Sequence, residues 1–123
     1  MANTRIASAR APLSALNNAV TIPVGLADTV VCYIEGVIVG TVVFEGSFDS
    51  TDGVNGIWRA TAATPANGSN RHTQVANQAF TGTFSQSAFY AVRTLGLPWV
   101  RMRVSAYTSG SAVGVLESRN CSF

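Results

Sequence analysis

The stretch WVRMRVSAY, residues Trp99–Tyr107, alternates apolar and polar positions, and so does TVVFEGSFD, residues Thr41–Asp49. Successive side chains of a β-strand face opposite sides of the sheet, so this period of two predicts strands with one buried face. The residues that we expect on the buried face are Val42, Phe44, Val100, Met102, Val104 and Ala106. The opposite face of the second stretch carries arginine and aromatic side chains, which predicts that the function lies on a surface.

The remainder of the chain has short apolar runs separated by turn residues, and no convincing helical periodicity. We expect further strands at Val20–Leu26, Thr29–Glu35, Val39–Phe48, Ile57–Ala62, around 71–75, and at Ala79–Phe84, Ala88–Arg93 and Ala112–Ser118. Thr108–Ser111 is typical of a hairpin turn between the last two strands. Such spacing indicates an all-β fold, either a sandwich or a barrel. Of the two we expect an antiparallel β-sandwich, jelly-roll or immunoglobulin-like, with about 7–9 short strands.

Residues 1–20 have a different composition, rich in Ala, Asn and Ser with scattered apolar residues. Pro12 limits any helix there to about one turn near Leu13–Asn18. We therefore divide this single domain into an extended N-terminal arm, 1–20, and a β-sandwich, 21–123. An arm without its own core must be held by the sandwich or by a neighbouring subunit, and we expect Arg5 and Arg10 to contact such a neighbour.

The composition is 47% hydrophobic and only 11% charged, whereas about 25% charged residues is usual in soluble domains. Few charges promote association, so either much of the surface is covered by partners or it is a neutral surface rich in Thr and Ser. All the basic residues are arginine, and a net charge of +2 is too small for a general nucleic-acid binder. Arginine is suited to ordered protein interfaces.

The two cysteines, Cys32 and Cys121, lie far apart in the sequence. Cys32 falls in an apolar strand, where a free cysteine is a common small core residue, and a disulfide between the two stays open. The chain has no apolar run typical of a secretory signal or of a membrane span. These features predict a protein that is made and assembled in a cytosol.

No catalytic or metal-binding set stands out. His72 is the single histidine, and no nucleophile motif accompanies it. Asp49–Gly53 lacks the alternating acidic ligands of a calcium loop and is typical of a turn. We therefore expect no enzymatic activity, no cofactor and no metal.

The outward stripe of Trp99, Arg101, Arg103 and Tyr107 is the first candidate site. This stripe fits a protein interface. The alternatives are that it binds single-stranded nucleic acid or a sugar, or that it is an ordinary solvated face of the sheet. The two arginines could also form salt bridges across strands to Glu45.

A second candidate site is the apolar segment Val37-Ile38-Val39, which lies between two glycines. It is explained either by strands that run longer than expected or by an apolar tip that docks on another subunit.

Two segments, GTVVFEGSFDSTDGVNGIW (Gly40–Trp58) and WVRMRVSAYTSGSAVGVLES (Trp99–Ser118), together resemble a small β-sandwich domain of phage and prophage structural proteins. The matching residues are Gly40, Thr41, Phe44, Glu45, Gly46, Ser47, Asp49 and Trp58, and then Val100, Arg101, Arg103, Val104, Tyr107, Thr108, Ser109, Gly110 and Ala112. The apolar segment before Gly40 departs from the usual pattern, and the arm lies outside the resemblance.

The resemblance implies a capsid decoration (cement) protein that binds between capsomers and stabilises a phage head. Its partners would be the major capsid protein and copies of itself. A trimer is one arrangement that these copies could form. It would be located in the virion after assembly in the host cytoplasm. Nucleic acid, membranes and small-molecule substrates are not expected as partners. The alternative is a carbohydrate- or host-surface-binding module of a phage fibre or tail. The residues expected at the partner interface are Arg5, Arg10, Val37, Ile38, Trp99, Arg101, Arg103 and Tyr107.

Overall fold

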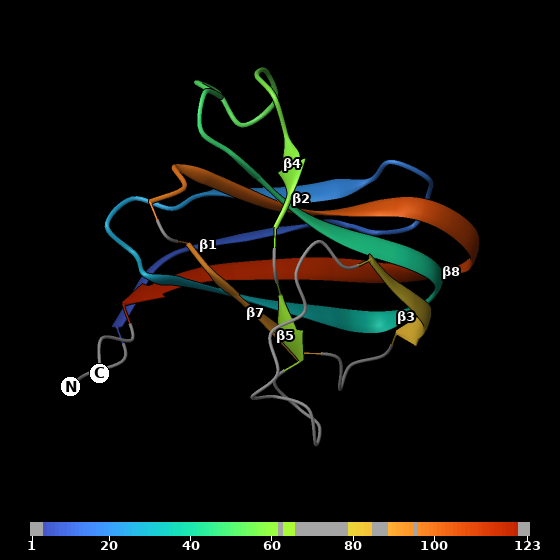
Figure 1. Ribbon diagram of the computed structural model, residues 1–123. Coiled ribbons are helices and arrows are strands. Elements are labelled where there is room, and N and C mark those ends of the chain that lie inside the picture. The colour runs from blue at the N-terminus through green and yellow to red at the C-terminus, as the bar shows by residue number, and fades with distance from the viewer. Residues whose placement is uncertain (1–3, 62, 66–78, 85–88, 95, 121–123) are drawn as a thin grey trace.

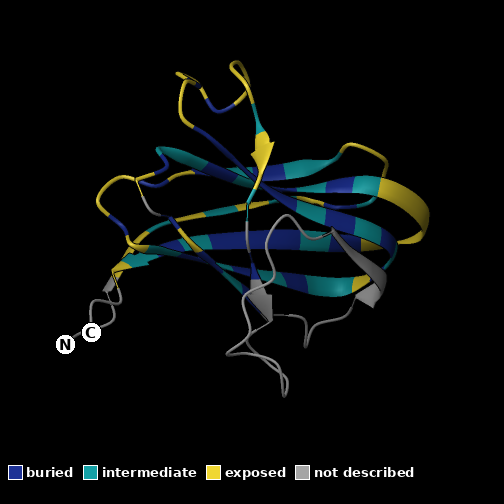
Figure 2. Cartoon of the chain, viewed as in Figure 1, coloured by how far each residue is buried: buried dark blue, intermediate teal, exposed yellow. Residues whose placement is uncertain are grey.

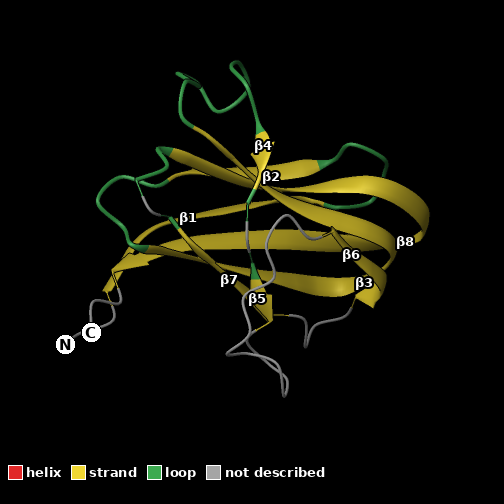
Figure 3. Ribbon diagram, in the orientation of Figure 1, coloured by secondary structure: helices red, strands yellow, loops and turns green. Residues whose placement is uncertain are grey.

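The computed structural model describes residues 4–61, 63–65, 79–84, 89–94 and 96–120. These residues form antiparallel strands and no helix, which confirms the all-β prediction (Figures 1 and 3). The strands are β1 (Thr4–Pro12), β2 (Ala19–Pro23), β3 (Thr29–Ser47), β4 (Arg59–Ala60), β5 (Thr64–Pro65), β6 (Ala79–Phe84), β7 (Phe89–Arg93) and β8 (Trp99–Asn120). The strand expected around 71–75, His72 and Cys121 lie outside the described residues.

Two long strands, β3 and β8, form the centre of the sheet. They contain 19 and 22 residues and pair from Thr29 opposite Arg119 to Ser47 opposite Trp99. On the free side of β8, its first part pairs with β2 and its last part with β1. On the free side of β3, its first part pairs with β7 and its later part with β6 and β4, while β5 pairs with β7. Every described strand except β5 is therefore hydrogen-bonded to β3 or β8.

The expectation of short strands is wrong at the centre of the sheet. The two strands predicted within 29–48 are one strand, and the hairpin turn predicted at Thr108–Ser111 is part of continuous β8. Gly36 and Gly110 adopt φ values of +100° and +105°, which other residues rarely reach. A Cβ atom on Gly40 would lie 2.2 Å from the carbonyl oxygen of Ala106. The glycines that resemble turn residues in the sequence instead let two long strands bend together.

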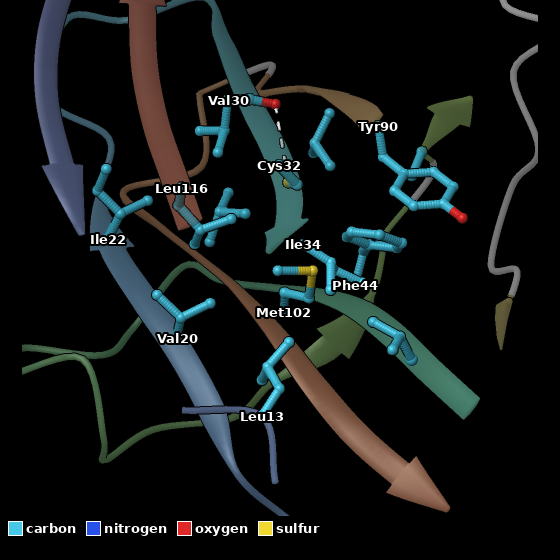
Figure 4. Packing of buried hydrophobic residues seen from close by; sticks show 14 of the residues in the cluster. Leu13, Val20, Ile22, Val30, Cys32, Ile34, Phe44, Tyr90, Met102 and Leu116 are labelled. Atoms are coloured by element: carbon cyan, nitrogen blue, oxygen red, sulfur yellow. Dashed lines mark hydrogen bonds between the residues drawn. The ribbon is translucent and has the colours of Figure 1, made fainter. Parts of the chain in front are cut away.

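The bend folds the sheet over, so that its two halves face each other across the core (Figures 1 and 4). The rings of Phe44 and Tyr90 lie 5.2 Å apart, although they belong to opposite halves. A methyl group on Gly114 would approach within 2.9 Å of Met102 and 2.8 Å of Leu13, which packs from the segment after β1. Each long strand therefore contributes side chains to both faces of one core.

The core prediction is confirmed for five of its members: Val42, Phe44, Val100, Met102 and Val104 are all at most 1% exposed. Ala106 is exposed, contrary to the alternation. The register between β3 and β8 shifts between Thr41 and Val42, so that Ser105 has no paired residue. One extra residue in a strand interrupts the alternation of side chains, which explains the error at Ala106.

The apolar segment Val37-Ile38-Val39 lies within β3, as expected if the strands run longer than predicted. Ile38 is fully buried, so it is not available to a partner and its assignment to the interface is corrected. Val37 is 49% exposed at the bend.

The segment predicted as an arm contributes a strand to the sheet. Thr4–Pro12 is β1, which pairs with the last part of β8. Ala7, Ala9 and Ala11 pack against the core from β1, and Leu13 is fully buried. Alanine buries little area, so the period of two in this segment is hard to recognise in the sequence. That residues 1–20 also contact a neighbouring subunit stays a prediction.

Cys32 is a free, fully buried thiol, as the sequence indicated. Burial raises the pKa of this thiol because the thiolate would lose its hydration.

Replacing Val104 by Asp should unfold the protein, because an unpaired carboxylate in the core costs on the order of several kcal/mol. The matched control is Ala106→Asp, two positions further along the same strand, where the side chain is exposed. Circular dichroism and thermal unfolding would compare the two variants. Normal thermal stability of the Val104→Asp variant would contradict the assignment of the core.

Candidate functional site

The loop that connects β3 to β4, residues 48–58, projects from the folded sheet (green in Figure 1). Its side chains satisfy its own backbone. The Oδ1 atom of Asp49 accepts a hydrogen bond from the amide of Ile57 at 2.9 Å. The Oδ1 atom of Asp52 accepts hydrogen bonds from the amides of Val54 and Asn55, both at 2.8 Å. These bonds give the β3–β4 loop a defined shape without a core of its own.

The prediction of a turn at Asp49–Gly53 is confirmed by these contacts. Gly53 and Gly56 have φ values of +83° and +85°. The hydrogen bond from the amide of Ile57 lowers the pKa of Asp49, and that from the amide of Asn55 lowers the pKa of Asp52. Among the described residues, no three His, Cys, Asp or Glu side chains are grouped as metal ligands.

Three apolar side chains of the β3–β4 loop are turned to solvent. Most of the loop is coloured as exposed in Figure 2. Phe48, Val54 and Ile57 are 71%, 79% and 58% exposed. Exposing apolar side chains on a loop that is held in shape costs free energy unless a partner covers them. This loop is therefore the best candidate for an interaction site.

A groove of about 510 Å³ lies at the base of the loop. Its lining comes from the end of β3, the loop, β4, and the segment at the end of and after β7, and consists of Gly46, Phe48, Asp49, Ile57, Arg59, Ala60, Thr61, Arg93, Thr94 and Leu97. Phe48, Ile57 and Leu97 supply an apolar wall, and the exposed arginines Arg59 and Arg93 supply positive charge. The groove thus combines apolar surface with two guanidinium groups.

The predicted stripe is held by ion pairs within the chain. Glu45 is only 9% exposed, and its Oε1 atom accepts hydrogen bonds from the Nε atoms of Arg101 at 2.8 Å and Arg103 at 2.9 Å. Arg103 also donates to Glu45 Oε2 at 3.3 Å and to the Oδ1 atom of Asn17 at 3.1 Å. The cross-strand salt bridge weighed for Glu45 is therefore present, to both arginines.

The electrostatics of this cluster follow from its geometry. Burial alone would raise the pKa of Glu45, but hydrogen bonds from Arg103 and Arg101 outweigh it and lower the pKa. The hydrogen bond to Glu45 in turn raises the pKa of Arg103. The carboxylate is therefore charged in the folded protein at neutral pH.

Two tryptophans connect the stripe to the β3–β4 loop. The Cζ atom of Arg101 lies 4.2 Å from the ring centroid of Trp58, which is a cation–π contact. The Nε1 atom of Trp58 donates to the carbonyl of Asn55 at 3.1 Å. A Cβ atom on Gly53 would meet the ring of Trp99 at 2.8 Å, so the loop rests on this ring. Side chains of the stripe therefore contact the β3–β4 loop and help to hold it in place.

The other predicted interface residues are distributed over two further places. Tyr107 lies at the bend, where its hydroxyl donates to the carbonyl of Gly110 at 2.7 Å. Arg5 and Arg10 lie on β1 and form ion pairs with Glu117 and Glu35. The structure therefore groups Trp99, Arg101 and Arg103 and places Val37, Tyr107, Arg5 and Arg10 elsewhere on the surface, whereas Ile38 is buried in the core.

Sequence reasoning missed the groove residues Phe48, Ile57, Arg59 and Arg93. Phe48 and Ile57 are apolar residues that flank a run of Asp, Ser, Asn and Gly, and this pattern was a usable signal. Arg59 and Arg93 are distant in the sequence, and nothing in the sequence indicates that they line one groove.

Comparison with known proteins gives the fold but no family. No protein-family model and no curated protein matches the chain. Among solved structures, the crystal structure of the SPBc2 prophage-derived protein YomS is similar, with a TM-score of 0.57 and 15% sequence identity. The alignment covers 91% of this chain and 95% of YomS, so the two share one fold along almost their whole lengths. No helix within the described residues has the length and apolar character needed to cross a membrane.

Replacing Glu45 by Gln should destabilise the protein by about 2 kcal/mol, because two partly buried guanidinium groups lose their carboxylate. The matched control is Glu35→Gln, which breaks the exposed pair with Arg10 and should cost clearly less, because solvent screens exposed ion pairs. Urea denaturation would measure both. Equal effects of the two changes would contradict the structural role of Glu45.

Acid should remove the contribution of Glu45. Because the pKa of Glu45 is lowered in the folded state, its stabilisation is present above the ordinary glutamate pKa of about 4.3 and is lost as the pH falls through the lower, folded value. The difference in unfolding free energy between wild type and Glu45→Gln should shrink from pH 7 to about pH 3. A difference that stays constant over this range would refute the lowered pKa.

Proposed function

We propose that this chain is a phage structural protein that decorates or cements the capsid through protein–protein contacts. It would lie in the virion, after assembly in the host cytoplasm, and bind the major capsid protein and further copies of itself. We also propose that the folded sheet is a β-sandwich of the kind found in phage structural proteins. The role is structural, and no catalytic step is part of it.

The observation that carries this proposal is the set of exposed apolar side chains on the β3–β4 loop. Phe48, Val54 and Ile57 are presented by a loop that hydrogen bonds and tryptophan contacts hold in place. A preformed apolar surface binds a partner at a lower entropic cost than a flexible one. Apolar anchors of this type favour a protein partner.

Two further observations support the phage setting. The segments Gly40–Trp58 and Trp99–Ser118 resemble a domain of phage and prophage structural proteins. The fold is similar to that of YomS, which is itself prophage-derived. The low charge content is in keeping with a surface that is partly covered after assembly.

The proposal is tested by measuring the amount of this chain in particles. Particles induced from the strain that encodes the chain would be purified, and mass spectrometry would give the molar ratio to the major capsid protein. A decoration protein should be present in a ratio near that of the capsomers. A few copies per particle would favour the alternative, a receptor- or carbohydrate-binding module of a fibre or tail. Absence from particles would overturn the proposal.

The double replacement Phe48→Ser and Ile57→Ser should lower particle occupancy by about tenfold or more, because two apolar anchors are lost. The control is Leu26→Ser, since Leu26 is the most exposed of the large apolar side chains described but does not line the groove. Both variants should keep the thermal stability of the wild type. Unchanged occupancy of the double variant would exclude the β3–β4 loop as the attachment site.

A further inference from the structure

The arginines of this chain divide into two sets. All six acidic side chains lie within the described residues, so the ion pairs can be assigned. Of the seven described arginines, the five with a carboxylate within ion-pair distance are Arg5, Arg10, Arg101, Arg103 and Arg119. The two without such a partner in the described part of the chain are Arg59 and Arg93. Both of these arginines line the groove at the base of the β3–β4 loop.

Asp49 is the only acidic side chain among the described residues that line the groove, and it does not neutralise both arginines. The Oδ1 atom of Asp49 is occupied by the amide of Ile57 and by the hydroxyl of Ser47, at 2.9 Å and 3.1 Å. Arg59 lowers the pKa of Asp49 through space, but the two groups are not within ion-pair distance. The described lining therefore carries two guanidinium groups against one carboxylate, which leaves an excess of positive charge beside the apolar wall.

The polar groups of the groove do not suit a sugar. The hydroxyl of Thr94 donates to the carbonyl of Ala27 at 2.9 Å and is buried. The bonds of Asp49 hold the loop. A sugar needs several free donors and acceptors for its hydroxyl groups, whereas this groove, apart from Thr61 and the second oxygen of Asp49, offers mainly guanidinium groups and apolar surface. A carboxylate and an apolar side chain together match it better.

We propose that the groove binds an acidic segment of a protein partner. An apolar side chain of the segment would pack against Phe48 and Ile57, and its carboxylates would pair with Arg59 and Arg93. This inference rests on the proposed function in that the partner is a protein, and it adds the chemistry by which that protein is recognised. The planar guanidinium group of arginine makes two parallel hydrogen bonds to a carboxylate, which gives direction as well as attraction.

The test uses purified protein and a displayed library of short random peptides. Wild type and the double variant Arg59→Gln, Arg93→Gln would each be used as bait, and enriched peptides would be measured by fluorescence anisotropy. The charge control is Arg119→Gln, because Arg119 is paired with Glu117 and does not line the groove. Thermal unfolding would show that all variants are folded.

We expect wild type to enrich peptides that place an aromatic or aliphatic residue next to two or more Asp or Glu residues. The double variant should bind them at least about tenfold more weakly, whereas the Arg119→Gln variant should retain most of the affinity. Enrichment of neutral or basic peptides, or equal binding by the double variant, would overturn the inference.

Two other occupants are tested directly. If dextran sulfate binds wild type as tightly as the peptides do, positive charge alone accounts for binding and the inference is wrong. If sedimentation shows an association of wild type that the double variant loses, the occupant is a second copy of this chain, which also overturns it.

The peptide experiment needs no particles, so the two proposals can fail separately. Enriched acidic peptides together with absence of the chain from particles would leave the groove assignment standing and remove the virion role. If the chain is abundant in particles but its groove selects no acidic peptide, the virion role stands and the groove assignment is wrong.

Discussion

The hydrogen-bonded ladder between β3 and β8 is the constraint on which the rest of the structure depends. Seven of the eight described strands belong to this pair or bond directly to it, and the bend in the pair brings the two halves of the sheet face to face. The bend depends on glycine because the backbones approach too closely for a side chain at Gly40 and because Gly36 and Gly110 need a positive φ. The position of the bend in β3 and β8 therefore determines which residues form the core, which strands form the edges and where the loops lie.

The outer face of the same ladder positions the β3–β4 loop. Glu45 on β3 holds Arg101 and Arg103 of β8, and Arg101 in turn lies over the ring of Trp58. The buried face of β3 and β8 stabilises the core. Their solvent-facing side holds the β3–β4 loop, which presents apolar side chains. The charged stripe and the β3–β4 loop therefore form one structural unit. The ion pairs of the stripe hold the loop in place, and the loop presents its apolar side chains to solvent.

The alternation of residues was enough to predict the all-β fold and the five central core residues, because burial on one face of a strand requires a period of two. It was not enough at the bend, where Gly110 and its Ser and Thr neighbours have the composition of a turn but lie inside a strand. Nor did it identify β1, because alanine gives a weak apolar signal. The sequence indicated that Trp99, Arg101 and Arg103 lie together on one face. Salt bridges from the two arginines to Glu45 were only one of several interpretations that it allowed. The groove was missed because Arg59 and Arg93 come to line one groove only through tertiary folding.

The distance along the chain between the paired strands has a consequence for how the protein folds. Even the nearest pair of the ladder, Ser47 and Trp99, joins positions more than a third of the chain apart. The entropy of closing such a large loop is lost before the ladder begins to stabilise the chain, so the contact order is high and folding is slow, on a scale of about milliseconds to seconds. During synthesis, β3 has neither its central neighbour nor its core until β8 has left the ribosome. The backbone edge of β3 that pairs with β8 therefore lacks its partner until the last strand of the sheet has been synthesised.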